Sequence, residues 1–463
     1  MKLTYNVNDR PKFGQLLLFG LQQLLAILAA TIAVPSIIGN GINEINGMSQ
    51  SAALFGAGVG TVVYLLFTKF RSPVFLGSSF AFIGSMFAAF AGAASAQAGH
   101  AGLILGALFA GLVYVIIAIV IKLAGVRWIN KLMPAVVIGP TVAIIGLSLA
   151  GNAVGDLTKG KVLDAAGVST ASPYVALICG LVTLFVVVLC SVYGKKMAKL
   201  IPFIIGICAG YAAAAIFTVI GIASGNDALK IIDFSVFRNM DWFAIPDFTF
   251  FEAAKGLKAI DGHYIATVAV AYVPVAFVVF AEHIADHKNL STIIDKDLLE
   301  DPGLHRTLLG DGVGSIAGAL FGGCPNTTYG ESVGCVAITG NASVVTILTT
   351  AAMAIIISFF GPFVTFLASI PNCVMGGVCI TLYGFIAVSG LKMIQEVDLG
   401  DNRNLFVVAV ILICGIGGLT VSFGKVTLTS IACALILGIL TNVMVSAGKN
   451  REASDSSAPS DKE

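Results

Sequence analysis

The chain has 463 residues, of which 57% are hydrophobic and only 11% are charged, and its mean hydropathy is +0.96. One water-soluble core cannot bury so much apolar surface, so the composition predicts a protein that lies in membrane lipid. The formal net charge of +1 leaves no strongly basic or acidic balance, and we expect no nucleic-acid partner.

Apolar runs follow one another along almost the whole chain. A helix that spans a membrane needs about 20 mostly apolar residues, and we count about fourteen such runs. The third, ninth and tenth are short or rich in Gly, Ser and Thr. The runs lie near residues 14–37, 48–68, 73–90, 102–121, 132–151, 174–194, 200–222, 264–285, 307–322, 326–339, 344–367, 372–391, 404–423 and 427–446.

Basic residues mark every second connection, as the positive-inside rule requires of cytoplasmic loops. We therefore predict a multi-pass protein with both termini in the cytoplasm, including residues 1–13. Residues 223–263 would form a long extracytoplasmic connection. Residues 447–463 are small, polar and charged, and should be a disordered cytoplasmic tail. The basic residues concerned are Lys2, Arg10, Lys12, Lys69, Arg71, Lys122, Arg127, Lys131, Lys195, Lys196, Lys199, Lys288, Lys296, Arg306, Lys392, Arg403, Lys449 and Arg451.

Two short matches between the halves predict an internal repeat. Residues 133–139 resemble residues 370–376, with Pro, Val and Gly in register, and residues 78–82 resemble residues 327–331 in residue class. Both matches join runs that are seven apart. Seven is odd, so the second half would cross the membrane in the opposite direction, as in the inverted repeats of secondary transporters.

The third and tenth runs are the candidates for broken helices at a substrate site. Corresponding helices of inverted repeats are often interrupted near the middle of the membrane, where they expose backbone groups to substrate. Both runs are short and polar. The alternative interpretation is that their Gly and Ser residues only allow close helix packing.

Two acids stand out inside apolar segments, Glu331 in the tenth run and Glu282 in the eighth. A buried carboxylate can accept hydrogen bonds from ring N–H groups, and burial disfavours its charged form, so that it can also carry a proton. Glu282 could instead be an interfacial carboxylate. Helical spacing places Asp286 on the same face. We expect His287 at a solvated helix end and assign Asp311 to a loop edge.

Several motifs together resemble the nucleobase–cation symporters of the nucleobase/ascorbate type (nucleobase:cation symporter-2), and within them the branch of bacterial uracil permeases. The resemblance covers nearly the whole chain. The motifs are Gln22-Gln23-Leu24-Leu25-Ala26 through Pro35, Leu76-Gly77-Ser78-Ser79-Phe80-Ala81-Phe82, Trp242-Phe243-Ala244-Ile245-Pro246, Ala281-Glu282-His283, Asp301-Pro302-Gly303-Leu304-His305-Arg306 and Pro325-Asn326-Thr327-Thr328-Tyr329-Gly330-Glu331.

The resemblance implies an all-α polytopic membrane protein with about fourteen helices in a 7+7 inverted repeat and short strands in the third and tenth segments. A core domain (14–121 and 264–367) and a gate domain (132–222 and 372–446) would move against each other. It also implies a bacterial inner (plasma) membrane location, a possible homodimer, and proton-coupled import of uracil or a related nucleobase with no cofactor apart from the proton.

The resemblance also assigns roles to individual residues. Glu282 and Glu331 would hydrogen-bond the uracil ring, with backbone groups of Phe80 and Gly330 at its polar edge and Tyr329 lining the site. The residues assigned to proton coupling are Glu282, Asp286, Gln23 and Ser79. The chain departs from the family pattern at Gln23 and Asp286, where His is frequent, at Ser332, where Asn is usual, and at Gly340, where a basic residue is frequent.

Three alternatives to a uracil symporter remain. A purine or xanthine symporter would share the architecture and differ in the pocket. An anion transporter of the same fold would use paired helix N-termini, although two carboxylates would repel its substrate. A membrane enzyme would need a metal, and the spacing of His283-x-x-Asp286-His287 only weakly resembles that of metal ligands. We expect no catalytic residues, no metal site and, from nine scattered cysteines, no disulfides.

Overall fold

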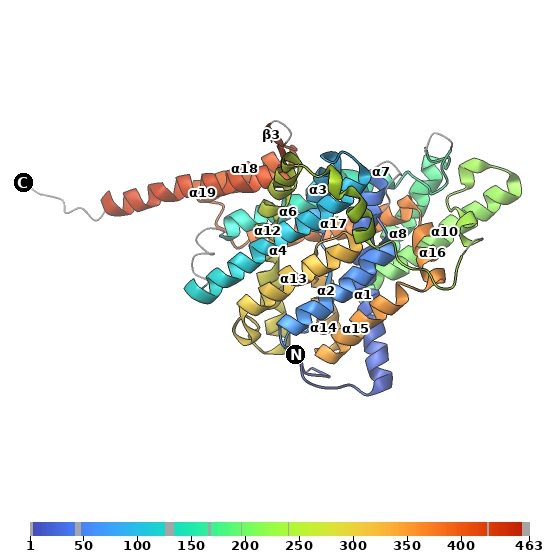
Figure 1. Ribbon diagram of the computed structural model, residues 1–463, viewed down its shortest axis with the longest axis horizontal. Coiled ribbons are helices and arrows are strands. Elements are labelled where there is room, and N and C mark those ends of the chain that lie inside the picture. The colour runs from blue at the N-terminus through green and yellow to red at the C-terminus, as the bar shows by residue number, and fades with distance from the viewer. Residues whose placement is uncertain are drawn as a thin grey trace, which may run out of the picture.

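The apolar runs fold into helices, because a helix satisfies its backbone hydrogen bonds without water. The computed structural model describes residues 3–41, 48–125, 134–164, 168–195, 197–238, 240–423 and 426–455. The first-half helices are α1 (Phe13–Gly41), α2 (Gln50–Phe67), α3 (Ile83–Ala91), α4 (Ala96–Ala124), α6 (Ala135–Ser148), α7 (Ala150–Asp156), α8 (Pro173–Tyr193), α9 (Met197–Leu200) and α10 (Pro202–Ser224) (Figure 1). The later helices are α11 (Thr249–Gly256), α12 (Gly262–Ile294), α13 (Leu304–Gly322), α14 (Gly330–Thr339), α15 (Val344–Ile357), α16 (Gly361–Ser369), α17 (Asn372–Ile394), α18 (Asn402–Ile416) and α19 (Ser430–Asp455).

Each predicted run contains a helix in the described part of the chain. Eight of the described helices are long and apolar enough to cross a membrane, and shorter apolar helices account for the third, eleventh, thirteenth and fourteenth runs. Helices α13 and α14 carry the ninth and tenth runs. The prediction of an all-α polytopic membrane protein is confirmed.

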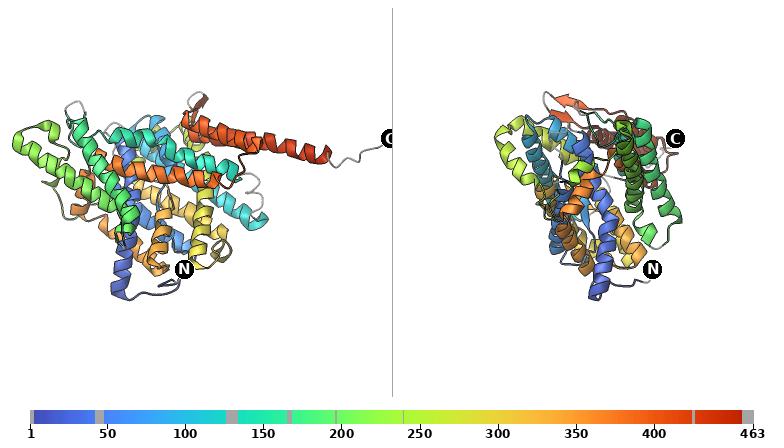
Figure 2. Two further views of the ribbon diagram at one scale, coloured as in Figure 1. Left: turned by 180° about the vertical axis from the view of Figure 1, so that it is seen from behind. Right: turned by 90° about the vertical axis from the view of Figure 1, so that its right-hand side faces the viewer.

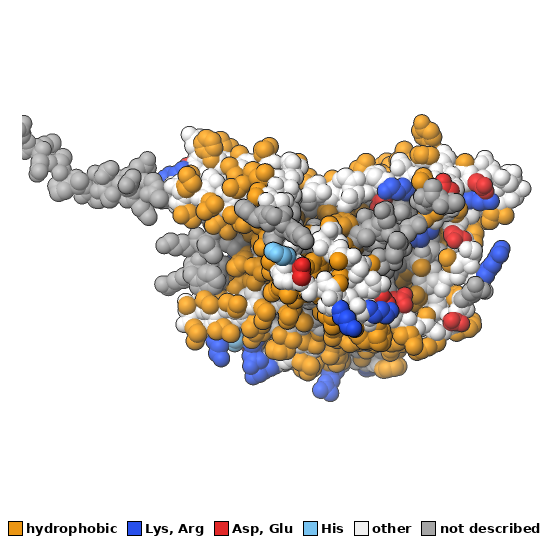
Figure 3. Space-filling view, turned by 45° about the horizontal axis from the view of Figure 1, so that its top comes forward, with side chains coloured by type: hydrophobic (Ala, Val, Ile, Leu, Met, Phe, Trp, Pro, Cys, Tyr) orange, Lys and Arg blue, Asp and Glu red, His pale blue; other side chains and the backbone are white. Residues whose placement is uncertain are grey.

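The surface has the character expected of a protein in lipid. Hydrophobic side chains cover most of the face seen in Figure 3, and Lys and Arg side chains gather toward its lower and right-hand margins. Large apolar side chains such as Leu123 (81% exposed) and Ile413 (73% exposed) have no protein cover. Such broad apolar exposure is stable only where lipid covers it.

Several predicted limits were wrong. The run 344–367 is two helices, α15 and α16, because Pro362 cannot continue a helix from the preceding turn. Helix α19 extends to Asp455, into the segment predicted as a tail, where Ala, Lys, Arg and Glu are strong helix formers. Residues 132–133 of the fifth run and 456–463 of the tail lie outside the described residues.

A second pair of strands was not predicted. Strands β3 (Val421–Phe423) and β4 (Val426–Leu428) pair antiparallel between α18 and α19. The prediction placed these residues in the last two helices because they are apolar. Their β-branched residues on both sides of Gly424 are a typical hairpin signal.

Helix packing repeats at an offset of seven spans. Helix α2 packs on α13 and α6 packs on α17, which pairs the second span with the ninth and the fifth with the twelfth. Other contacts come as matched pairs. The α4–α12 contact in one half corresponds to the α15–α1 contact in the other. In the same way, α8–α10 corresponds to α18–α19, and α8–α17 corresponds to α18–α6. A twofold axis between the halves produces this pattern, so the packing supports the inverted repeat.

The most extensive helix pairs lie within two groups. Helices α1–α4 and α12–α15 form the core group, which contains the α2–α13 pair, and α6–α10 and α17–α19 form the gate group, which contains the α6–α17 pair. In the gate group, α8 and α10 lie at one end of the molecule and α18 and α19 toward the other, with α6 and α17 between them (Figure 1). Figure 2 shows from behind how α19 extends beyond the rest.

Candidate functional site

Two short strands, one from each half, meet inside the core group. Strand β1 (Leu76–Ser78) pairs antiparallel with β2 (Asn326–Thr328), with Leu76 opposite Thr328 and Ser78 opposite Asn326. Both strands are buried. The predicted strands in the third and tenth segments are confirmed.

Each strand is followed after one residue by the start of a helix. A 3-10 helix begins at Phe80 and leads into α3, and α14 begins at Gly330. Phe80 and Gly330 therefore occupy equivalent positions in the two halves. The predicted alignment of residues 78–82 with 327–331 paired Phe80 with Tyr329, so it was shifted by one residue. The first N–H groups of a helix have no partner within it, so both helix starts offer backbone donors.

Close packing and side-chain hydrogen bonds hold the strand pair in place. The Asn326 side chain donates to the Gly56 carbonyl (3.0 Å), and the Thr61 hydroxyl accepts from the Leu76 amide (2.9 Å). The Tyr329 hydroxyl donates to the Ser78 carbonyl (2.8 Å). A Cβ atom on Gly77 would overlap the Tyr329 ring, so only glycine fits there.

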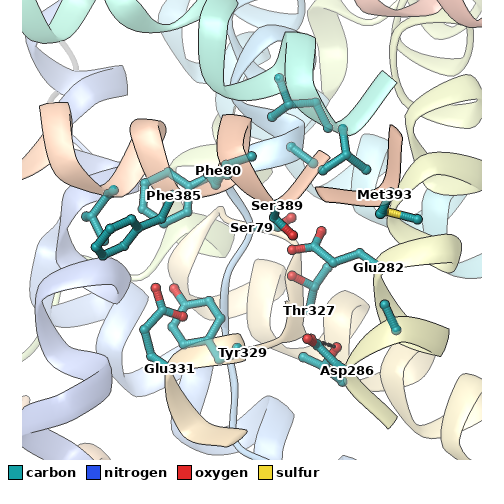
Figure 4. Close-up of a pocket in the computed structure, with 18 of the residues that line it drawn as sticks. Ser79, Phe80, Glu282, Asp286, Thr327, Tyr329, Glu331, Phe385, Ser389 and Met393 are labelled. Atoms are coloured by element: carbon teal, nitrogen blue, oxygen red, sulfur yellow. Dashed lines mark hydrogen bonds between the residues drawn. The ribbon is translucent and has the colours of Figure 1, made fainter. Parts of the chain in front are cut away.

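A cavity of about 380 Å³ lies beside the strand pair, between the core and gate groups. It is lined by most of the predicted site residues, which come from the 3-10 turn before α3, from α12, and from the first turn of α14 and the residue before it. Figure 4 shows Glu282 and Asp286 on one side and Glu331 and Tyr329 on the other. The predicted residues that line it are Ser79, Phe80, Glu282, Asp286, Tyr329, Gly330 and Glu331.

Three carboxyl groups dominate the polar wall. Glu282 and Asp286 lie one turn apart on α12, and Glu331 lies in the first turn of α14, where the helix dipole favours a carboxylate. Asp286 accepts a hydrogen bond from the Thr328 hydroxyl (2.9 Å). No Lys or Arg is among the described residues that line the cavity. Binding a proton therefore relieves repulsion within the cluster.

The gate group supplies a wall that the sequence did not predict. Among its lining residues Ser389 is polar and the rest are apolar, so they carry no signal that separates them from lipid-facing residues of the same helices. Phe385, also in this wall, is 56% exposed, and the lining residues from α17 run from Leu382 to Met393, toward the C-terminal end of that helix. The gate residues are Val142, Ile145, Phe203, Leu382, Phe385, Ile386, Ser389 and Met393.

Gln23 does not line the cavity. Its side-chain amide donates to the Ser332 hydroxyl (2.6 Å), which also accepts from the Phe75 amide (3.1 Å). The pair lies behind Glu331, which precedes Ser332 in α14. Gln23 thus contacts the residue that follows the site carboxylate Glu331 in the chain.

A buried polar network lies on the other face of α12. His283 contacts Asp311 (2.7 Å) and Thr307 (3.0 Å), and His287 contacts the Tyr64 hydroxyl (2.7 Å). His287 is buried and not at a solvated helix end, and Asp311 is buried inside α13 and not at a loop edge. Both expectations were wrong because Gly310 and Gly312 allow neighbouring helices to close over Asp311.

No group of three or more His, Cys, Asp or Glu side chains in the described residues could hold a metal ion.

The chain matches the sequence model of a family described as "Permease family" over residues 14–423. It is 38% identical over 447 residues to the uracil permease of Bacillus caldolyticus, covering 96% of this chain and 95% of that protein. The uracil permease of Bacillus subtilis (strain 168) is 36% identical over 459 residues, covering 98% of each. That of Escherichia coli (strain K12) is 34% identical over 435 residues, covering 94% of this chain and 92% of that protein.

Solved structures with a similar fold are more distant. The transmembrane domain of the cyanobacterial bicarbonate transporter BicA has a TM-score of 0.61 at 16% identity, covering 95% of this chain and all (100%) of that domain. The murine Slc26a9 anion transporter in the inward-facing state has a TM-score of 0.64 at 13% identity, covering 95% of this chain and 70% of that one. Fold, sequence relatives and family match agree, and the chain belongs to this family of permeases, which are transporters and not enzymes.

Proposed function

We propose that the chain imports uracil in symport with protons. The observation that carries this proposal is the cavity between the two groups, where three carboxyl groups, two helix starts and four aromatic rings converge without a basic residue among the described lining. The names of the relatives in Bacillus and Escherichia support the choice of substrate.

The cavity offers uracil a complementary polar edge. Glu282 and Glu331 accept hydrogen bonds from the ring N–H groups, and the backbone N–H groups of Phe80 and Gly330 donate to its carbonyl oxygens. The rings of Phe80 and Tyr329 provide apolar faces. An uncharged ring suits this site because its binding adds no further charge to the carboxyl cluster.

Proton coupling rests on the same cluster. Glu282 and Asp286 bind the proton that enters with uracil, with Ser79 beside them in the cavity, and Gln23 acts on Glu331 through Ser332. The inward proton gradient then drives import, because the protonated carboxyl groups release their proton to the cytoplasm, where the proton concentration is lower.

The gate group moves against the core group to expose the cavity on either side of the inner membrane. With both termini in the cytoplasm, the C-terminal half of α17, which lines the cavity, points to the cytoplasm, as we expect of an inward-open state. The resemblance implies a homodimer as well, which the mass of the purified protein in detergent would test.

An anion is a poorer candidate substrate, although the two solved structures named above are transporters of anions by name. Those neighbours are too distant to indicate more than a fold. The carboxyl cluster would repel an anion, and no described lining residue is basic. A purine is the alternative substrate. An assay of whether purines compete with uracil for uptake distinguishes the two.

The test is radiolabelled uracil uptake into proteoliposomes with an inward proton gradient and with the gradient collapsed. We expect gradient-dependent uptake by the wild type, blocked by excess uracil but not xanthine, and lost in Glu282→Gln. Glu300→Gln, at an exposed acid outside the cavity, is the matched control. Absence of uracil uptake by folded wild type would refute the substrate, and uptake indifferent to the gradient would refute the coupling.

A further inference from the structure

A second, smaller cavity lies against the first. It has a volume of about 170 Å³ and shares two lining residues, Phe80 and Ile145, with the main cavity. Their side chains therefore form the wall between the two spaces. Phe80 belongs to the core group and Ile145, on α6, to the gate group. A relative movement of the groups separates the two halves of this wall.

The second cavity lies on the extracytoplasmic side in the orientation proposed above. Its lining comes from the C-terminal end of α6, the start of α7, the middle of α3 and the start of α19. Each of these segments adjoins a connection predicted to be extracytoplasmic. The main cavity is lined by the opposite half of α17, which is cytoplasmic in this orientation, so Phe80 and Ile145 lie between the main cavity and the outside.

The chemistry of the second cavity matches a neutral, planar heterocycle. Its polar side chains are Ser148, Asn152, Thr429 and Ser430, and none of its described lining residues is charged. The Ser148 hydroxyl donates to the Ile145 carbonyl (3.0 Å), and Thr429 accepts from the Ala432 amide (3.3 Å).

Two of the polar groups are available to a ligand. Within the described part of the chain, the side chains of Asn152 and Ser430 make no hydrogen bond. A carboxamide offers both donors and an acceptor, as the alternating N–H and C=O edge of a pyrimidine requires. Phe80 and Phe87 supply aromatic faces for stacking.

We propose that this cavity is an outer subsite that holds the neutral nucleobase before Phe80 and Ile145 move apart and admit it to the main cavity. The inference rests on the proposed function and adds a second binding position for the same substrate. Asn152 hydrogen-bonds the base edge, with Ser430 as the second contact, and no proton is bound there because the described lining holds no carboxyl group.

The first test is uptake kinetics of the double variant Asn152→Ala/Ser430→Ala in right-side-out proteoliposomes. We expect KM for uracil uptake to rise about fivefold to tenfold, the loss that one or two neutral hydrogen bonds give. Equilibrium binding of uracil to the purified variant should change by less than about twofold, because neither Asn152 nor Ser430 lines the main cavity. Val154→Ala, on the same short helix but outside the cavity, should leave both values unchanged.

The second test detects the ligand directly. The thiol introduced by Asn152→Cys should react with a membrane-impermeant methanethiosulfonate added outside, and uracil should slow this reaction even when Glu282→Gln is also present. Mass spectrometry of the peptide separates this thiol from the native cysteines.

The outcomes distinguish the two proposals. Normal wild-type uptake with an unchanged KM in the double variant, or a thiol that uracil does not protect, would overturn the outer subsite alone. A fall in equilibrium binding equal to the rise in KM would overturn it too, because the residues would then act on the main cavity. Wild-type protein that neither transports nor binds uracil would overturn the proposed function and the ligand of the subsite together.

Discussion

Gln23 and Ser332 are hydrogen-bonded to each other, with 2.6 Å between the amide nitrogen and the hydroxyl oxygen. These are two of the positions at which the chain departs from the pattern of the family it resembles. The departures are thus a matched pair, in which a small hydroxyl in α14 receives a long amide from α1. Ser332 also holds the Phe75 amide, so the pair joins α1, α14 and the segment before β1.

The substitution Gln23→Ala removes one member of this pair and leaves the Ser332 hydroxyl without its donor. We expect a loss of stability of about 1 kcal/mol and a several-fold weaker uracil affinity, because the backbone around Glu331 loses a support. Uptake should remain dependent on the proton gradient. Thermal unfolding in detergent and uptake with and without the gradient measure both effects. Uncoupled uptake with unchanged affinity would show instead that Gln23 takes part directly in proton movement.

Gly77→Ala should abolish transport. The new methyl group would overlap the Tyr329 ring and displace it, which breaks the Tyr329–Ser78 hydrogen bond at the cavity wall. Overpacking of this kind costs about 1–3 kcal/mol. Gly334→Ala is the control, since no atom lies within 4 Å of the added methyl group. Uracil binding to both purified variants checks the prediction, and equal affinities would contradict it.

His283→Ala should destabilise the protein more than either Gln23→Ala or Gly77→Ala. It leaves the buried Asp311 without its His283 contact, and the second Asp311 carboxylate oxygen already has no hydrogen-bond partner among the described residues. Leaving a buried polar group without its hydrogen-bond partner costs about 1–3 kcal/mol, and the cavity left by the missing imidazole ring adds to this loss. The melting temperature in detergent measures the loss. Ile284→Ala is the neighbouring control, and equal melting temperatures would show that Asp311 finds another partner.

Asp301 gives a pH-dependent contribution to stability through its contacts with Lys296 and Arg71. Hydrogen bonds from Lys296 and Arg71 lower the pKa of this carboxyl group. A lowered pKa stabilises the fold at pH values above the unfolded pKa, about 3.9, and the contribution disappears as the pH falls through the folded value. Asp301→Asn should therefore lower the melting temperature at pH 7, and the difference from wild type should shrink toward about pH 3. A difference independent of pH would exclude this ion pairing as its cause.

The sequence predicted the elements that carry an unusual residue for their surroundings. Glu282 and Glu331 are acids in apolar runs, and the polar third and tenth runs are exceptions among spans, so the interrupted segments and one wall of the cavity were predictable from the residues. The short strands were expected only from the family resemblance. The other wall was not, because Val142, Phe385 and their neighbours look like any lipid-facing residue. His287 and Asp311 were misplaced for a related reason, since their polar partners come from helices distant in sequence.

The strand pair has a consequence for how such a chain arose. Each half supplies one strand and one helix start. One half alone cannot form the β1–β2 pair, and it would need a second copy of itself, inserted in the opposite direction, as its partner. Two identical copies would carry the same residue at the positions now held by Phe80 and Gly330. A single chain can hold different residues at these positions, here a phenyl ring at Phe80 and no side chain at Gly330. An asymmetric ring can then bind in one orientation on a scaffold that is itself symmetric.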